Sequence, residues 1–404
     1  MKFRILGLCA LVVTLFAGCV RDDYPPYGPG IIEHGGSERV GMDDYLYDRT
    51  VILYCEGFNN LKTYLLNNIS LLETGYVPEK WADRALLVYE HFPEKAGDYK
   101  TLTSPVVYRL YKDHGETVRD TILTYPAESG SATSAFMKRV LTDISMEMPS
   151  RSWGMIYSSH GTGWLPADYK KSSEPGISLF SIGAEFGGPY AGGLEISDFR
   201  EAMPFQFEFM IMDACLMGGV EVVYEWRDVC RYLVASPGEI LAAGMDYARM
   251  GSRLLEGEDV DLKGVCEDYM KFYREDATIA LYDCAKVTGL VEPCRAVFEK
   301  YRSSISNLDP DAVQGFNYNY DVHFDFRDIL VKAGASDEEL SDVDAALESL
   351  VLYKDAKQTF FNQKINTYCG LSMFLPNDRY WPVLSGSYLS NSWNMAADYY
   401  SIDK

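Results

Sequence analysis

Two residues that could carry out nucleophilic chemistry stand just after apolar, strand-like runs. His160 follows residues 153–158 (WGMIYS), and Cys215 follows residues 207–212 (FEFMIM). A free thiol has a pKa of about 8.5, and a nearby imidazole can take its proton and later return one to a leaving amine. The pair therefore indicates acyl transfer through a cysteine nucleophile. The plainer alternative is a small buried cysteine and an ordinary loop histidine.

The backbone around both residues suits that chemistry. Gly161 would let a substrate approach the main chain closely, and the N–H groups of Gly161 and Cys215 could together stabilise an oxyanion. A helix is predicted after Cys215, and the dipole at its N-terminus would favour the thiolate.

The pattern of the chain predicts how these residues meet. Apolar runs alternate with helical patterns, which is typical of βαβ units and a mainly parallel sheet. Reactive side chains gather at the carboxyl ends of such strands, and neighbouring strands about 4.8 Å apart would put the thiol within reach of the imidazole. Strands are predicted at residues 50–55, 85–89, 106–111, 153–158, 207–212, 232–235, 278–282 and 371–375. Helices are predicted at residues 61–72, 131–148, 194–203, 218–227, 244–256, 261–275, 286–306, 325–333, 337–355 and 393–400.

Composition and missing motifs exclude several classes of protein. The 404 residues are 47% hydrophobic and 24% charged, which is globular composition. The net charge of −22 repels phosphates, so we expect no nucleic-acid partner. We also expect a monomer. No GxSxG, HExxH or P-loop pattern occurs, which argues against a serine hydrolase elbow, a zinc metallopeptidase and a P-loop nucleotide site.

The N-terminus has the pattern of a bacterial lipoprotein signal. Lys2 and Arg4 precede an apolar stretch at 5–17 that is too short to be a lone transmembrane span, and it ends in Gly18-Cys19. We predict removal of residues 1–18 and lipidation of Cys19, with an ordinary signal peptide and a chance cysteine as the alternative. Residues 19–48 would then form a flexible tether, 49–308 a catalytic domain, and 309–404 either its C-terminal part or a small α/β subdomain. The acidic pair at 22–23 resembles the surface-export signal of Bacteroidetes lipoproteins, which predicts an outer-membrane, surface-exposed protein.

Seven cysteines follow Cys19, and they form neither a CxxC pair nor a zinc-site spacing. Three disulfides and one free thiol are arithmetically allowed. A domain of this size can build its own core without such links, so we expect scattered buried thiols and no structural metal.

The residues around His160 and Cys215 resemble a known family. The segments His160-Gly-Thr-Gly-Trp164 and Asp213-Ala-Cys-Leu-Met217 are similar to the site motifs of the clostripain-like cysteine peptidases, within the caspase–hemoglobinase superfamily. Looser similarity extends over residues 54–61, 235–239 and 370–376. The resemblance implies an α/β, caspase-like fold: a mainly parallel central sheet with helices on both faces and a C-terminal α/β extension.

The same resemblance implies roles for individual residues. His160 would be the general base and Cys215 the nucleophile, with no third member required. Asp213 would lie at the floor of the S1 pocket and pair with an Arg or Lys at P1, and Ser236 would lie on the pocket wall. A turn-forming or helix-capping role is the alternative for Asp213. Asp246 is a further candidate pocket acid.

The resemblance also raises two questions of regulation. Family members are often cut between the catalytic residues, and the basic pair Lys170-Lys171 is a candidate self-cleavage site, with an ordinary solvated loop as the alternative. No cofactor is required, but some members depend on Ca²⁺, for which the acidic stretch at 309–328 is a candidate.

Two functional hypotheses follow from the sequence. The first is a lipid-anchored cysteine endopeptidase that acts on peptides or proteins after Arg or Lys. The second is a catalytically silent surface lipoprotein of peptidase fold that binds a peptide, a glycan or a partner protein.

Overall fold

Nine strands form one central sheet in the computed structural model, which describes residues 47–129, 132–167, 182–187, 192–316, 322–361, 363–376 and 381–401. Across the sheet the strands lie in the order β12-β10-β9-β8-β5-β1-β2-β3-β4. The five in the middle run parallel, whereas β3 and β4 at one edge and β10 and β12 at the other pair antiparallel. The strands are β1 (Tyr47–Glu56), β2 (Arg84–His91), β3 (Val106–Asp113), β4 (Glu116–Thr124), β5 (Ser150–Ser158), β8 (Phe207–Asp213), β9 (Cys230–Ala235), β10 (Thr278–Asp283) and β12 (Val351–Ala356).

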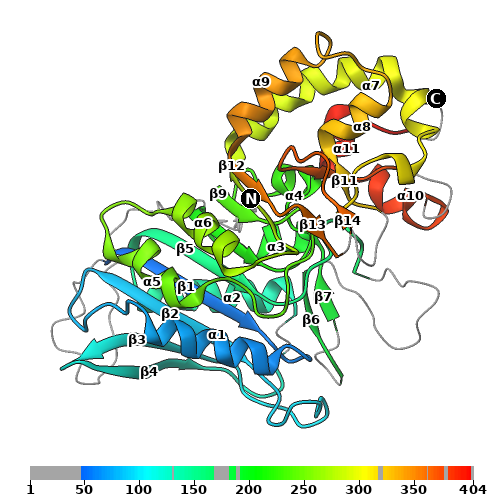
Figure 1. Cartoon of the computed structure of the whole chain (residues 1–404). Helices are drawn as coiled ribbons and strands as arrows, with labels where there is room; N and C mark the ends of the chain where they lie inside the picture. Colours follow the sequence, from blue (N-terminus) through cyan, green and yellow to red (C-terminus); the bar gives the residue numbers. More distant parts are fainter. Residues whose placement is uncertain are drawn as a thin grey trace, which may run out of the picture.

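Helices cover both faces of this sheet, and each face has its own apolar core (Figure 1). One face is covered by α1 (Lys62–Thr74), α5 (Tyr247–Gly251) and α6 (Leu262–Phe272). The other is covered by α2 (Ser134–Glu147), α3 (Ile196–Ala202) and α4 (Val220–Glu225). Strands buried on both faces are continuously apolar, which is why the central runs were recognisable in the sequence. The α/β, caspase-like fold is confirmed.

The C-terminal helices stand together beside one end of the sheet (Figure 1). They are α7 (Val291–Ser306), α8 (Phe326–Lys332), α9 (Ser341–Leu350), α10 (Trp381–Leu389) and α11 (Ser392–Ala397). This part is joined to the rest in two ways, because β12 pairs with β10 and the short strand β15 (Ser372–Met373) bridges to Gly219. The division predicted at residues 308/309 stays a prediction. Within the described ranges no helix is long and apolar enough to cross a membrane.

Two elements of the central sheet differ from the sequence expectation. The helix predicted at 337–355 ends at Leu350, and residues 351–356 form strand β12, because β10 offers an unpaired sheet edge to this short run. Strand β4 was missed because its residues are mostly exposed or half-buried on both faces, which leaves no alternation of apolar side chains to recognise.

A buried carboxylate joins helix α4 to the C-terminal part. Glu221 is fully buried, and its Oε1 accepts hydrogen bonds from the Phe374 N–H at 2.9 Å and the Tyr388 hydroxyl at 3.1 Å. Burial raises the pKa of Glu221 to about 7, against the opposing effect of the Phe374 N–H. An unfolded glutamate has a pKa of about 4.3, so the folded state binds the extra proton. The stability that this group contributes is fully present below the unfolded pKa of about 4.3. It is lost as pH rises from there through the folded pKa of about 7.

We predict that Glu221→Gln flattens this pH dependence. Glutamine keeps the Oε1 acceptor for both donors but cannot ionise in the core. Relative to wild type, the free energy of unfolding of the variant should increase between pH 5 and pH 8 by up to about 3 kcal/mol. Urea unfolding at several pH values measures it. Glu201→Gln removes the same charge from an exposed position on α3 and should follow wild type. Parallel pH curves for wild type and Glu221→Gln would contradict the assignment.

Candidate active site

The candidate catalytic residues lie in adjacent loops because of the register between two parallel strands. Ser158, the last residue of β5, is paired with Asp213, the last residue of β8. His160 and Cys215 therefore each stand two residues beyond a paired position. The loops touch: a Cβ added to Gly161 would lie 2.7 Å from the carbonyl oxygen of Cys215. The structure thus brings together the two segments that the sequence singled out.

The His160 ring is half-buried and has two neighbours from distant parts of the chain. Its Nε2 lies 2.7 Å from the Oδ1 of Asn60, in the turn between β1 and α1. The ring is nearly parallel to that of Phe186, at 6.2 Å between centroids. Burial lowers the pKa of His160 to about 4, so its imidazole is neutral at pH 7. A neutral imidazole can serve as a general base.

The Cys215 thiol is held by the loop after β9. Its Sγ accepts a hydrogen bond from the Ile240 N–H at 3.3 Å and lies 3.4 Å from the Ile240 carbonyl oxygen. Burial, then the negative charge of Glu239, raises the pKa of Cys215 to about 12, while the Ile240 N–H acts in the opposite direction. In this state the thiol is neutral and has a peptide group as its partner.

The turn after the nucleophile is backbone-strained and tightly held. Leu216 has φ of 65°, a conformation that costs a non-glycine residue about 1–2 kcal/mol. The turn is held in place because the Leu216 N–H donates to the Gly238 carbonyl at 2.9 Å and the Gly218 N–H donates to the Ser236 carbonyl at 2.8 Å. The loop after β9 therefore fixes the direction in which Cys215 is presented.

The two N–H groups predicted to stabilise an oxyanion are available. Gly161 forms an antiparallel bridge with Ile182. The hydrogen bond of this bridge runs from the Gly183 N–H to the His160 carbonyl, so the bridge does not occupy the Gly161 N–H. Among the described residues, neither the Gly161 nor the Cys215 N–H has a hydrogen-bond acceptor. Both belong to the two touching loops, as an oxyanion hole requires.

Asp213 is a buried acid two residues before the nucleophile. It is 6% exposed, and its Oδ2 accepts hydrogen bonds from Ser158 at 2.7 Å and Tyr247 at 2.6 Å. Burial raises the pKa of Asp213, and the two hydroxyl donors oppose that shift. Its Oδ1 has no donor within the part of the chain that the structure describes.

The other two predicted pocket residues have different surroundings. Ser236 is fully buried, and its hydroxyl is bonded to Thr278 at 2.7 Å and to the Gly238 N–H at 3.1 Å. It shapes the loop around the nucleophile, and a contact with substrate stays a prediction. Asp246 is half-buried and pairs with Arg249 at 3.5 Å. It lines a small cavity with Arg249, Met250, Arg253, Val265 and Asp268.

The sequence analysis missed a buried acid cluster beside His160. Glu56 and His91 are paired at the ends of β1 and β2, and the His91 Nδ1 lies 2.7 Å from the Oε1 of Glu185, in β6 (Ile182–Glu185). The hydroxyl of Tyr157 bonds to Glu56. Burial and the charge of Glu185 raise the pKa of Glu56 well above its usual value, which favours its neutral form. The signal available in the sequence was the position of Glu56 and His91 at strand ends.

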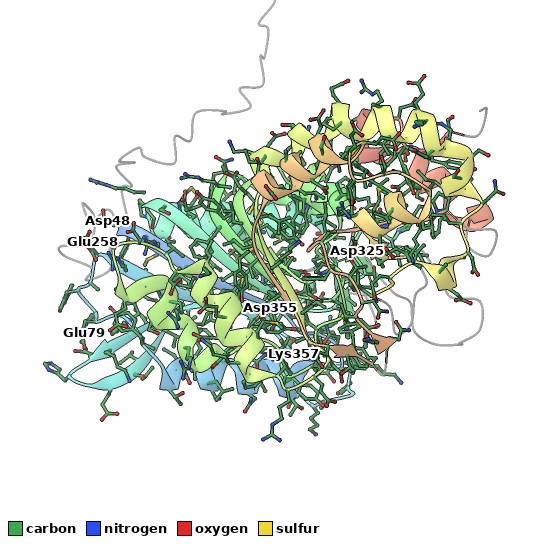
Figure 2. All side chains as sticks on the ribbon, turned by 45° about the horizontal axis from the view of Figure 1, so that its top comes forward. Asp48, Glu79, Glu258, Asp325, Asp355 and Lys357 are labelled. Carbon is green, nitrogen blue, oxygen red and sulfur yellow. The ribbon has the colours of Figure 1, made fainter. Side chains whose placement is uncertain are left out.

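Three predicted positions and part of the candidate calcium site lie outside the described residues. The three positions are Lys170, Lys171 and Cys19, and the part of the candidate calcium site is residues 317–321. In the described part of the acidic stretch, carboxylates serve as caps: Asp325 accepts from the Asp328 N–H, and Asp328 accepts from the Gln314 N–H. Figure 2 shows Asp325 among the C-terminal elements, away from Asp48 and Glu79 at the other end of the sheet. Among the described residues, no group of three His, Cys, Asp or Glu side chains is arranged to hold a metal ion, and a Ca²⁺ site in this stretch stays a prediction.

Cysteine burial separates Cys215 from the other thiols. All seven cysteines of the described chain are free, and six of them are buried, whereas Cys215 is only partly buried. A reactive cysteine must be accessible, and a buried one behaves as a small apolar side chain.

A partly exposed thiol and an imidazole on touching loops at the carboxyl edge of a mainly parallel sheet are the arrangement that a cysteine peptidase requires. Sequence comparison gives the family: a model of the clostripain family matches residues 53–401, so the chain belongs to that family. It is 24% identical over 432 residues to clostripain of Hathewaya histolytica, covering 88% of this chain and 80% of that protein. Membership favours an active peptidase over a silent binding lipoprotein.

Solved structures support the same fold. An inactive zymogen C11 protease from Parabacteroides distasonis superimposes with a TM-score of 0.74 and 24% identity, covering 87% of this chain and 98% of that one. A secreted C11 cysteine protease from Bacteroides thetaiotaomicron gives 0.72 and 24%, covering 87% and 99%. A secreted C11 cysteine protease from the same organism, in complex with an irreversible peptide inhibitor, gives 0.70 and 22%, covering 88% and 100%.

We predict that Gly161→Ala inactivates the enzyme without unfolding it. The new Cβ would lie 2.7 Å from the Cys215 carbonyl oxygen and 3.0 Å from the Cβ of Ala214, so the two loops must separate. A shift of about 1 Å at a reacting centre can cost about a hundredfold in rate, and we expect kcat/KM to fall by that order. Peptide hydrolysis and thermal melting measure the two effects. Gly289→Ala, which would meet no neighbour within 4 Å, is the control.

Proposed function

We propose that this peptidase cleaves peptide bonds after Arg or Lys, with Cys215 as nucleophile and His160 as general base. The observation that carries the specificity is the buried carboxylate of Asp213, two residues from the thiol and with one oxygen that has no donor among the described residues. A guanidinium or ammonium group would supply the missing donor, and a buried charge-assisted hydrogen bond of this kind is strong. The proposed substrates are therefore peptides and proteins with a basic residue at P1.

The proposed reaction uses residues of both loops, the one that carries His160 and the one that carries Cys215. His160 takes the proton of the Cys215 thiol, and the sulfur attacks the carbonyl carbon of the scissile bond. The N–H groups of Gly161 and Cys215 stabilise the oxyanion. The imidazolium then gives its proton to the leaving amine, which breaks the C–N bond and leaves a thioester. Water, deprotonated by His160, hydrolyses the thioester and returns the thiol.

The resting geometry supports a step of activation. The Cys215 S–H donates to the Ile240 carbonyl oxygen, 3.4 Å from Sγ, so transfer of the thiol proton to His160 requires the S–H to turn away from that carbonyl. We propose that self-cleavage near Lys170 and Lys171, in the segment between β5 and β6, accompanies this change. The segment ends directly before β6, whose Gly183 is bonded to the His160 backbone.

The P1 specificity can be tested with fluorogenic peptides that differ only at P1. Wild-type protein should cleave after Arg and Lys, and Cys215→Ala should lose all cleavage and remain a single chain on a gel. Asp213→Asn should lose about 2–5 kcal/mol of transition-state binding for basic P1 residues, because a buried cation then lacks its counter-charge.

The matched control is Asp246→Asn, which removes the other candidate acid. Its selectivity should equal that of wild type. If Asp246→Asn lost the preference for Arg and Lys while Asp213→Asn kept it, the specificity would be assigned to the wrong carboxylate. If Cys215→Ala still cleaved the peptides, the proposed role of Cys215 as nucleophile would be refuted.

We also propose that the protein is an outer-membrane lipoprotein anchored through Cys19 and exposed at the cell surface. The support is the N-terminal pattern of the sequence. In cells, Cys19→Ala should abolish labelling by a radioactive fatty acid and move the protein out of the membrane fraction. Unchanged labelling in this variant would contradict the anchor, and protease shaving of intact cells distinguishes the surface from the periplasm.

A further inference from the structure

The contact between Asn60 and His160 specifies how the histidine is used. An amide oxygen only accepts hydrogen bonds, so the Nε2 that lies 2.7 Å from Oδ1 of Asn60 must carry a hydrogen. A neutral imidazole has only one N–H group. The lone pair is therefore on Nδ1, the nitrogen that Asn60 does not contact.

From this contact we infer that Asn60 is a positioning residue of the peptidase, which fixes the His160 tautomer and ring orientation so that Nδ1 accepts the thiol proton. The inference rests on the proposed role of His160. It goes beyond a two-residue mechanism, in which nothing would select between the two ring nitrogens.

The turn that carries Asn60 is well fixed, as a positioning residue requires. The neighbouring Asn59 is fully buried, and its amide group donates to the Glu56 carbonyl at 3.1 Å and to the Ala184 carbonyl at 2.6 Å. Its Oδ1 accepts from the Leu61 N–H at 2.8 Å, directly before helix α1 begins. Asn60 thus stands between a locked residue and a helix N-terminus.

The histidine loop is attached to the same point. The hydroxyl of Ser159 donates to the Glu56 carbonyl at 2.7 Å, which also accepts the bond from Asn59. One carbonyl at the end of β1 therefore holds the residue before His160 and the residue before Asn60. Phe186 covers the imidazole as a nearly parallel ring. These contacts fix the separation of the two backbone segments that carry Asn60 and His160, independently of the hydrogen bond between the side chains.

The choice of an amide rather than a carboxylate has a chemical consequence. A carboxylate at this position would stabilise the imidazolium and raise the basicity of His160 before substrate arrives. An amide orients the ring with little effect on its charge. The imidazole then starts neutral, consistent with its burial, and gains a stronger bond to Asn60 only when it becomes protonated.

The experiment compares Asn60→Ala and Asn60→Asp with Asn67→Ala, an exposed asparagine on α1 that touches neither loop. Because a freely turning ring spends less time in the productive orientation, Asn60→Ala should lower kcat about 10- to 100-fold with little change in KM or melting temperature. Asn67→Ala should match wild type in all three.

The pH profile of the isosteric variant gives a readout that a merely structural role would not move. In Asn60→Asp the carboxylate faces the imidazole, so the acid limb of kcat/KM should move upward by about one pH unit or more. The other titratable groups on the elements packed against His160 include Cys215, Glu239, the Glu56–Glu185 pair with its partner His91, and His323 behind Gly163. They are the same in every variant, as is Asp213 in the substrate pocket, so the difference between profiles isolates residue 60.

The outcomes separate this inference from the proposed function. A wild-type kcat for Asn60→Ala, an effect on KM alone, or an unmoved profile for Asn60→Asp would overturn the positioning role. If Asn60→Ala failed to fold, the profile of Asn60→Asp would decide. Activity that survived in His160→Ala would instead refute the proposed catalytic role of the histidine itself.

Discussion

The parallel register of β5 against β8 is the constraint on which the rest of the site depends. Pairing of Ser158 with Asp213 places the residues two positions further on at equal heights above the sheet edge. A slip of one residue would put one of the two side chains on the wrong face of its strand. The register is secured because both strands are buried on both faces, where any shift would displace two apolar cores at once.

Low polarity around this edge determines the charge state of the site. Burial raises the pKa of Cys215, lowers that of His160, and raises those of Asp213 and Glu56. Each shift favours the neutral form of its group. In the proposed mechanism, charge develops where a substrate supplies a partner: a P1 cation at Asp213, or an oxyanion at the N–H groups of Gly161 and Cys215. Water exclusion strengthens each of these interactions when it forms.

The C-terminal part contributes to the site although it holds neither catalytic residue. The Ser372 N–H donates to the Gly218 carbonyl, three residues after Cys215, and Glu221 is bonded to Phe374 and Tyr388. On the other loop, the ring of His323 lies close behind Gly163. Residues beyond 308 thus contact both loops, and the family match likewise extends to residue 401.

The sequence by itself determined the central strands, the chemical identity of His160 and Cys215, and the placement of Asp213 beside the nucleophile. These follow from local patterns: an apolar run, a strand end, and residues two positions apart in the chain. Only the tertiary structure decided which side chains and backbone groups contact these three residues. Asn60 meets His160 across 100 residues, Ile240 meets Cys215 across 25, and Tyr247 meets Asp213 across 34. The edge strands β4 and β12 also needed the folded sheet, because their stability comes from hydrogen bonds to a neighbour rather than from an apolar face. A single sequence carries no local signal for such contacts, since they depend on which strands become adjacent.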